Sequence, residues 1–109
     1  MSQTNIVLQN GKNPLKVDYL RTKKAALILR ALNHKLRQQM IKLIDDKQKI
    51  TVTEIYVKLR LEQSVASQHL AILRRAGIVA TTRDGKFIHY SVNYSRLAEV
   101  IKFADDLLG

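Results

Sequence analysis

The sequence predicts a mostly helical α+β fold, and three features of the chain support this. Five stretches either lack helix breakers or repeat apolar residues at the 3.6-residue period of a helix. Two β-rich runs flank Asp84-Gly85, a dipeptide that tolerates the positive φ angles of a tight hairpin turn. With 109 residues, 46% of them hydrophobic, the chain is long enough for a modest core. We therefore expect about five helices and one β-hairpin in a single domain over residues 17–109.

The N-terminal segment, residues 1–16, holds Asn, Gln, Gly and the only proline without a sustained period. This composition predicts a flexible arm with at most one anchoring cluster at Ile6–Leu8. The first helix, over residues 17–32, is cationic in its first half and apolar on more than one side in its second half. Asn33 is a suitable cap for the next helix, over residues 34–46. The inward side of that second helix is expected to carry Leu36, Met40, Leu43 and Ile44.

The middle of the chain predicts a short strand and a capped helix. Residues 50–52 are all β-branched, which favours a minor strand joining the hairpin. Thr53 is then placed to cap a helix over residues 54–60, with Glu54 near the positive end of the helix dipole. Residues 61–63 should form the turn into the following helix.

The helix expected over residues 63–75 has two chemically different faces. An apolar stripe at helical spacing should be buried, and it consists of Ala66, Leu70, Leu73 and Ala76. The opposite face has no carboxylate and carries Gln63, Ser64, Ser67, Gln68, Arg74 and Arg75. Ser and Gln can bond base edges in the DNA major groove, and the methyls of Val65 can contact a thymine methyl. The alternative for this helix alone is an ordinary amphipathic surface helix.

The hairpin that follows Gly77 favours the DNA-binding interpretation. Its turn at Asp84-Gly85 lies between Arg83 and Lys86, so the tip of the hairpin is cationic. A helix, a turn, a second helix and a basic-tipped hairpin together describe a winged helix-turn-helix. In that fold one helix enters the major groove and the wing lies along the backbone. The combination is more specific than any of its parts.

The charge of the chain also points to a polyanionic partner. Nineteen Lys and Arg against nine Asp and Glu give a formal net charge of +10, which suits nucleic acid or an anionic membrane surface. No apolar run approaches the ~20 residues of a membrane span, and the N-terminus does not resemble a secretory signal, so we expect a cytoplasmic protein. The absence of cysteine excludes disulfides and thiolate metal sites.

Several short motifs occur in the order found in one bacterial family. They are Ala31-Leu-Asn-His-Lys-Leu-Arg37, Val52-Thr-Glu-Ile55, Gln63-Ser-x-x-Ser-Gln-His-Leu70, Leu73-Arg-Arg-Ala-Gly-Ile-Val79, Arg83-Asp-Gly-Lys and His89-Tyr-Ser. Over residues 31–92 the sequence resembles the ArsR/SmtB repressors, and the resemblance implies a winged-helix DNA-binding fold. Glu62 is a departure, because the family usually has a Ser or Thr cap there. A carboxylate at this position can still accept from a free amide, and we expect only a small penalty in DNA binding.

The last helix, over residues 94–109, follows the capping residue Asn93 and carries a regular apolar stripe. Together with the strongly apolar first helix it suggests a subunit interface, and the resemblance implies that the two helices pack across a two-fold axis. Such a dimer would read an inverted repeat. The alternative is that both helices complete the core of the monomer. The expected interface residues are Leu27, Leu97, Val100, Ile101, Ala104 and Leu108.

Neither of the metal sites common in that family is expected here. Tyr56 and Lys58 stand where the family has a cysteine pair, and neither is a thiolate donor. Tyr94 and Arg96 stand where the second site has an Asp and a His, and Arg96 would repel a cation. Of the three histidines, which lack ligand spacing, His69 is expected to pack against the core or to contact phosphate. No nucleophile motif or glycine-rich phosphate loop is present, so we predict neither a cofactor nor an enzyme.

The sequence therefore predicts a sequence-specific regulator that binds double-stranded DNA as a homodimer, acting as a repressor on an inverted-repeat operator. The expected base-reading residues are Gln63, Ser64, Val65, Ser67 and Gln68. The expected backbone contacts are Thr53, Arg74, Arg75, Arg83 and Lys86. The alternatives are a non-specific architectural DNA-binding protein and a winged helix used for protein interaction. The sequence does not indicate an inducer.

Overall fold

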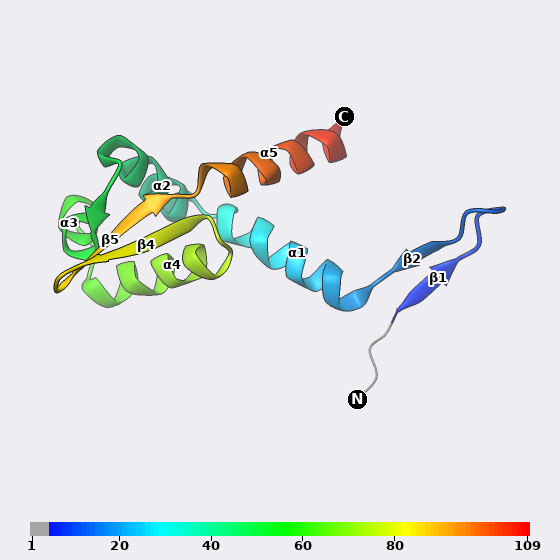
Figure 1. The fold of residues 1–109 in the computed structure, drawn as a ribbon, viewed down its shortest axis with the longest axis horizontal. Helices are drawn as coiled ribbons and strands as arrows, with labels where there is room; N and C mark the ends of the chain where they lie inside the picture. Colours follow the sequence, from blue (N-terminus) through cyan, green and yellow to red (C-terminus); the bar gives the residue numbers. More distant parts are fainter. Residues whose placement is uncertain (1–4) are drawn as a thin grey trace.

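The computed structural model describes residues 5–109 and has the element order β1-β2-α1-α2-β3-α3-α4-β4-β5-α5 (Figure 1). The strands are β1 (Ile6–Leu8), β2 (Leu15–Val17), β3 (Ile50–Thr51), β4 (Val79–Asp84) and β5 (Phe87–Val92). The helices are α1 (Tyr19–Leu32), α2 (Lys35–Lys47), α3 (Val52–Lys58), α4 (Gln63–Arg75) and α5 (Tyr94–Leu108). The predicted winged helix-turn-helix, with its helices and β-hairpin wing, is confirmed.

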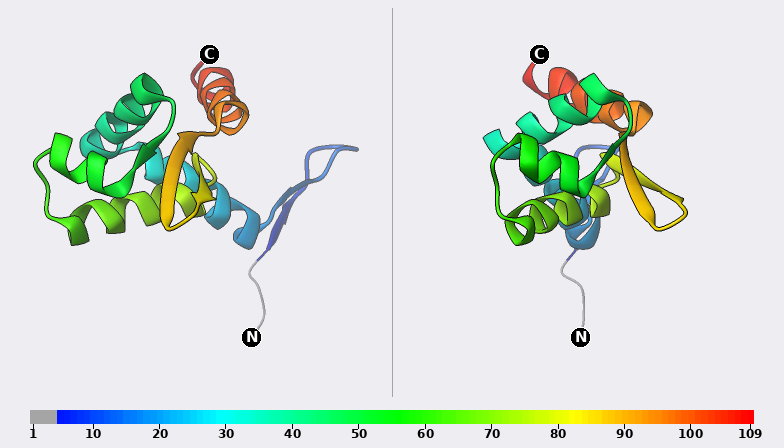
Figure 2. Two further views of the ribbon diagram at one scale, coloured as in Figure 1. Left: turned by 60° about the vertical axis from the view of Figure 1, so that its left-hand side comes forward. Right: turned by 90° about the vertical axis from the view of Figure 1, so that its left-hand side faces the viewer.

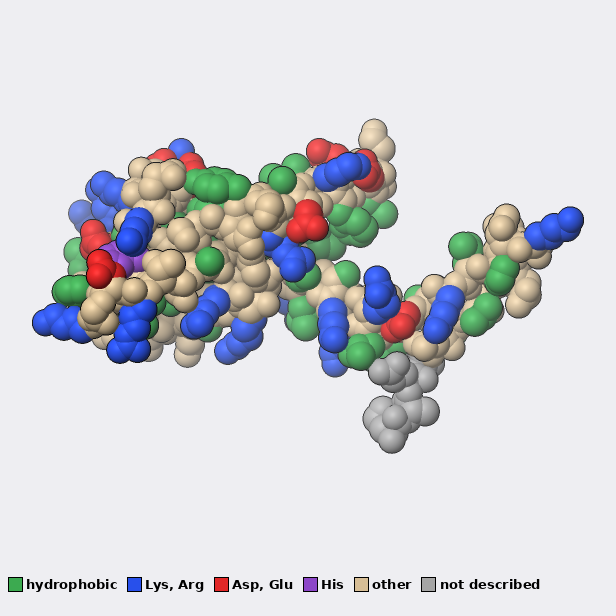
Figure 3. All heavy atoms as spheres, viewed as in Figure 1, with side chains coloured by type: hydrophobic (Ala, Val, Ile, Leu, Met, Phe, Trp, Pro, Cys, Tyr) green, Lys and Arg blue, Asp and Glu red, His purple; other side chains and the backbone are tan. Residues whose placement is uncertain are grey.

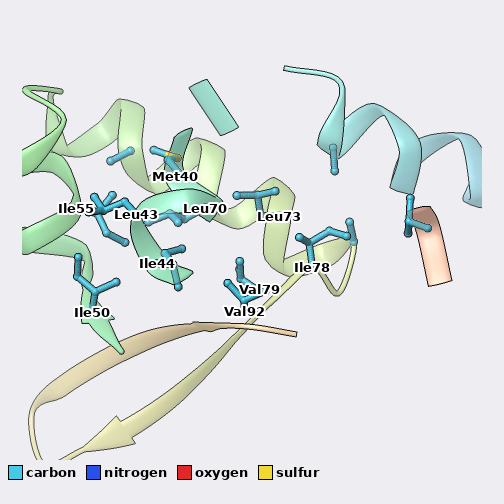
Figure 4. Packing of buried hydrophobic residues seen from close by; sticks show 14 residues of the cluster. Met40, Leu43, Ile44, Ile50, Ile55, Leu70, Leu73, Ile78, Val79 and Val92 are labelled. Atoms are coloured by element: carbon cyan, nitrogen blue, oxygen red, sulfur yellow. The ribbon is translucent and has the colours of Figure 1, made fainter. Parts of the chain in front are cut away.

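The hydrophobic core lies where α2, α3 and α4 meet the sheet (Figure 4). The stripe predicted on α4 is confirmed, since its members are buried: Ala66, Leu70, Leu73 and Ala76. On α2 the prediction holds for Met40, Leu43 and Ile44, whereas Leu36 is only half-buried. Arg37 is the fourth buried residue of that helix, and an apolar periodicity cannot reveal it. Burying side chains of this size stabilises the fold by about 1.5–3 kcal/mol each.

The wing is part of a three-stranded antiparallel sheet with the order β3-β5-β4. The predicted minor strand joins it, although β3 ends at Thr51 because the next residue begins α3. In the hairpin Asp84 pairs with Phe87, so the two-residue turn is Gly85-Lys86 rather than Asp84-Gly85. Gly85 has a φ of 62°, in the left-handed region that glycine occupies without steric cost.

Two predicted helix caps are wrong by one or two residues. Asn33 ends α1, and α2 is capped by His34, whose ring nitrogen accepts from the first free amides. Thr51, not Thr53, caps α3. Thr51 and Glu54 form a reciprocal capping box, in which the Thr51 hydroxyl accepts from the Glu54 amide at 3.2 Å and the carboxylate accepts from the Thr51 amide at 3.1 Å. The bond from the Thr51 amide, followed by a bond of 2.9 Å that the Thr51 hydroxyl donates to the same carboxylate, lowers the pKa of Glu54.

The segment expected to be a flexible arm, residues 1–16, contains a β-hairpin instead. Strands β1 and β2 pair antiparallel and extend away from the rest of the chain (Figures 1 and 2). Residues 1–4 lie outside the described range. Helix α1 begins two residues later than predicted, because Val17 belongs to β2 and Asp18 is the cap, its side chain accepting from the amide of Arg21.

Candidate nucleic-acid interface

The helix-turn-helix is formed by α3 and α4, joined by a short turn. Arg60 in this turn has a φ of 56°, and its amide and that of Leu61 close the end of α3 with hydrogen bonds of 3.2 and 2.9 Å to the carbonyls of Val57 and Tyr56. Glu62 is the cap of α4 but makes no side-chain capping hydrogen bond. The Glu62 carboxylate could accept from a free amide of α4, but it does not do so in this structure. The amides at the start of α4 remain available to an anion such as a phosphate.

The face of α4 that points away from the core is polar and exposed. Gln63, Ser64, Ser67 and Gln68 are all exposed, whereas Val65 is half-buried. The side-chain hydrogen bonds within residues 5–109 involve none of the four polar residues. Their donors and acceptors are therefore free for base edges.

A shallow groove of about 390 Å³ runs beside α4, toward the wing. It is lined by Ser67, Ala71, Arg74, Arg75 and Tyr90. Arg74 and Arg75 are exposed and belong to the last turn of α4. The groove thus brings two of the predicted backbone-binding cations next to strand β5. Tyr90 was not identified from the sequence, because only its place in the sheet brings it beside α4.

The tip of the wing carries exposed cations, as the sequence predicts. The Arg83 Nε donates to the carbonyl of Gly85 at 3.2 Å, which holds this side chain at the turn. The Lys86 ammonium lies 5.7 Å from the centroid of the Phe87 ring. In Figure 3 Lys and Arg side chains recur along the lower edge of the molecule, from the tip of the wing past α4 to α1, where carboxylates are few. Thr53 is exposed in the first turn of α3.

A buried cation of α2, Arg37, links α4 to the C-terminal end of α1. The Arg37 guanidinium donates to the carbonyls of Ala31 at 2.7 Å and Arg30 at 3.0 Å, and to Nδ1 of His69 at 3.1 Å. The His69 ring lies 4.7 Å from that of His34. Burial, followed by the electrostatic effects of the neighbouring His34 and Arg37 side chains, lowers the pKa of His69. His69 therefore connects α4 to α2 through Arg37.

The residues predicted for a subunit interface differ in exposure within one chain. Leu27, Ile101 and Leu108 are 51%, 53% and 86% exposed. Leu97 and Ala104 are half-buried. Val100 is only 8% exposed and packs in the core of its own chain, so it is the least suited of the six to contact a partner.

Three further features bear on function: the metal-binding potential of the chain, its membrane-spanning potential and a hydrogen bond at the start of α5. Within residues 5–109 no three His, Asp or Glu side chains gather in a way that could hold a metal ion. Across the same range, every helix is too short or too polar to span a bilayer. The Tyr94 hydroxyl donates to the Asp45 carboxylate at 2.5 Å, which fixes the start of α5 to α2 and raises the pKa of the phenol.

A polar recognition helix on a helix-turn-helix, with a basic wing beside it, defines a winged-helix DNA-binding protein. A family model described as a bacterial regulatory protein of the arsR family matches residues 34–81. An HTH-type transcriptional regulator of Methanocaldococcus jannaschii is 34% identical over 84 residues, which cover 77% of this chain and 94% of the relative. The chain therefore belongs to the ArsR family, and it is a DNA-binding transcriptional regulator.

Solved structures agree with this assignment. HlyU from Vibrio cholerae has a TM-score of 0.63 and 31% identity, and the match covers 80% of this chain and 94% of HlyU. The transcriptional repressor PagR of Bacillus anthracis has a TM-score of 0.63 and 29% identity, with 80% of this chain and 99% of PagR covered.

Proposed function

We propose that this chain is a homodimeric repressor that binds an inverted-repeat operator with α4 and the wing. The observation that carries the proposal is the exposed, carboxylate-free face of α4 beside a basic-tipped wing. A face of Gln and Ser suits base edges, whereas Lys and Arg at its margins suit phosphates, which position a protein without reading sequence. Among the relatives, PagR is named a repressor and HlyU an activator.

Each group of residues has its own part in this proposal. Base edges are met by Gln63, Ser64, Val65, Ser67 and Gln68. The DNA backbone is bound by Thr53, Arg74, Arg75, Arg83 and Lys86. Because Val65 is half-buried, its contribution is a methyl contact at most. The exposed ends of the other side chains are free to adapt to the DNA major groove.

The homodimer is supported by the apolar surfaces of α1 and α5. Ile101, Phe103 and Leu107 are 53%, 49% and 70% exposed, although α5 is a single helix of fifteen residues. On α1, Leu27 is half-exposed as well. Exposed apolar surface of this kind marks an interaction site. A two-fold partner would cover it and place the two recognition helices about one DNA turn apart.

The proposed regulator does not use the metal sites common in its family. Tyr56 is half-buried and Lys58 exposed on α3, and Tyr94 is hydrogen-bonded to Asp45. None of the three is a soft donor. We therefore expect operator binding to be the same with zinc and with a chelator.

The test is fluorescence anisotropy of the purified protein on its own upstream DNA and on a scrambled duplex, across a salt series. A preference of ~10³ or more for the upstream DNA is the range of specific binders and supports the proposal. Equal and steeply salt-dependent binding to both duplexes would instead indicate an architectural DNA-binding protein. A reporter placed behind the same DNA then separates repression from activation.

A further inference from the structure

Helices α1 and α4 border a cavity of about 520 Å³ to which no role has been assigned so far. It is distinct from a smaller cavity of about 160 Å³ between α1 and α5. Its volume lies within the ~300–1,000 Å³ of small-molecule sites. The lining residues fall into an apolar group and a cationic group.

The apolar group forms most of the wall. It consists of Leu27, Ile28, Ala31, Ile72 and Ala76. These residues come from the second half of α1 and the last part of α4, so a bound molecule would contact both the predicted dimer helix and the recognition helix. A wall of this kind binds an apolar body such as an alkyl chain or an aromatic ring.

The cationic group gives the cavity its specificity. It consists of Lys24, Arg30, Arg37 and Arg75, and no carboxylate lines the cavity. Arg37 is only 6% exposed, and its partners are two carbonyls and an imidazole, none of which carries a full negative charge. Within residues 5–109 the ion pairs are Lys42–Asp46 and Lys102–Asp106, and none of these four residues lines the cavity. The C-terminal end of α1 offsets part of the positive charge, and the remainder favours an anion.

We infer that the cavity binds a small amphipathic carboxylate, a molecule with one apolar body and a single anionic head. The apolar walls disfavour a compact polyanion such as a phosphate ester, and four cations without a carboxylate disfavour a neutral or cationic molecule. Inorganic anions lack the body that the walls would bury.

The ligand has a consequence for DNA binding, and this step rests on the function proposed above. Arg75 lines the cavity and also the groove beside Ser67 and Tyr90 on the DNA-facing side of α4. A carboxylate that engages Arg75 withdraws this cation from the DNA backbone. An occupied cavity therefore weakens operator binding, which makes the ligand an inducer.

The first experiment measures binding without DNA, by isothermal titration calorimetry with decanoate below its micelle concentration. We expect one decanoate per chain, and binding of decanol weaker by about tenfold or more because it lacks the charge. Lys24→Gln should weaken decanoate binding about two- to fivefold, the range of one exposed ion pair. Lys23→Gln is the matched control, since Lys23 is an exposed lysine of α1 that does not line the cavity. Ile72→Glu should weaken binding at least tenfold, with folding checked by circular dichroism.

Three results would overturn the site: no decanoate binding, equal binding of decanol, or equal losses in Lys24→Gln and Lys23→Gln. The last would mean that net charge alone attracts the anion. The second experiment adds decanoate to the protein bound to its upstream DNA. The affinity for this DNA should fall for the wild type, and it should fall by a smaller factor for Lys24→Gln. Unchanged affinity would refute the inducer role. A protein without preference for its upstream DNA would refute the proposed function alone, because calorimetry tests the cavity without DNA.

Discussion

His69 links the recognition helix to Arg37 through a hydrogen bond that requires an unprotonated Nδ1. Burial, followed by the electrostatic effects of His34 and Arg37, lowers its pKa below the ordinary 6.5. Between the lowered and the ordinary pKa, the unfolded chain binds more protons at this residue than the folded chain does. The free energy of unfolding should therefore decrease as the pH falls below about 6.5, and the loss should level off below the folded pKa.

His69→Gln keeps an acceptor for Arg37 but cannot titrate. We expect this variant to lose stability less steeply than wild type between pH 7.5 and pH 5, as measured by urea unfolding at each pH. A wild-type slope in His69→Gln would show that other groups govern the acid dependence.

Gln68 offers an amide on the exposed face of α4, where it can contact a base edge. A bidentate contact of this kind discriminates between bases by about 1–3 kcal/mol. Gln68→Ala should therefore weaken binding to the upstream DNA about 5- to 150-fold and leave binding to scrambled DNA unchanged. Lys86→Ala is the contrasting variant. Loss of a phosphate contact should weaken binding to the upstream DNA and to the scrambled DNA alike, and it should reduce the slope of log affinity against log salt concentration by about one. Anisotropy titrations measure both effects, and an unaltered operator affinity in Gln68→Ala would refute the assignment of α4.

At the scale of elements, α3 and α4 end with the same arrangement of hydrogen bonds. After α4 the amide of Gly77 donates to Arg74 at 2.9 Å and that of Ile78 donates to Leu73 at 3.0 Å. Gly77 has a φ of 76°, which glycine adopts without steric cost. After α3 the equivalent residue is Arg60, with a φ of 56° and a Cβ that is unfavourable in this region.

Arg60→Gly should therefore stabilise the protein by about 1 kcal/mol, because it relieves this strain while keeping the hydrogen bonds at the end of α3. The measurement is the urea midpoint of unfolding at constant slope. Arg60→Ala removes the same charge but retains the Cβ, so it should give no comparable gain. Equal gains in the two variants would attribute the effect to charge rather than to backbone strain.

Elements with a strong period or a distinctive turn could be predicted from the sequence, whereas those fixed by distant contacts could not. The bounds of α4 and the buried residues of its stripe follow from spacing alone. The shift of the cap to Thr51 depends on the reciprocal bond with Glu54, and the burial of Arg37 depends on the carbonyls at the end of α1. The cavity was not predicted either, since its walls come from helices about forty residues apart, with Leu27 and Ile72 among them.

The whole molecule is more extended than its length requires. Its radius of gyration is 17.6 Å, whereas a compact chain of this length has about 13 Å. The N-terminal hairpin and the outer parts of α1 and α5 account for this shape (Figure 1). One face of the hairpin carries four exposed apolar residues, Ile6, Leu8, Leu15 and Val17. An isolated two-stranded hairpin is at best marginally stable in water, so its apolar face, like that of α5, is suited to contact a partner.

The proposed homodimer can be tested on α5 without disturbing the core of the monomer. Ile101 is 53% exposed in one chain, so Ile101→Glu should leave folding intact. In a dimer the same change would bury an unpaired carboxylate, at a cost of several kcal/mol. We expect the dimer dissociation constant to rise at least ~100-fold, which corresponds to about 2.7 kcal/mol, as measured by sedimentation velocity. Ala98→Glu adds the same charge at an exposed position of α5 outside the apolar stripe and should dimerise as wild type does. If both variants remained dimeric, the interface would lie elsewhere, and a monomeric wild type would refute the two-fold operator model.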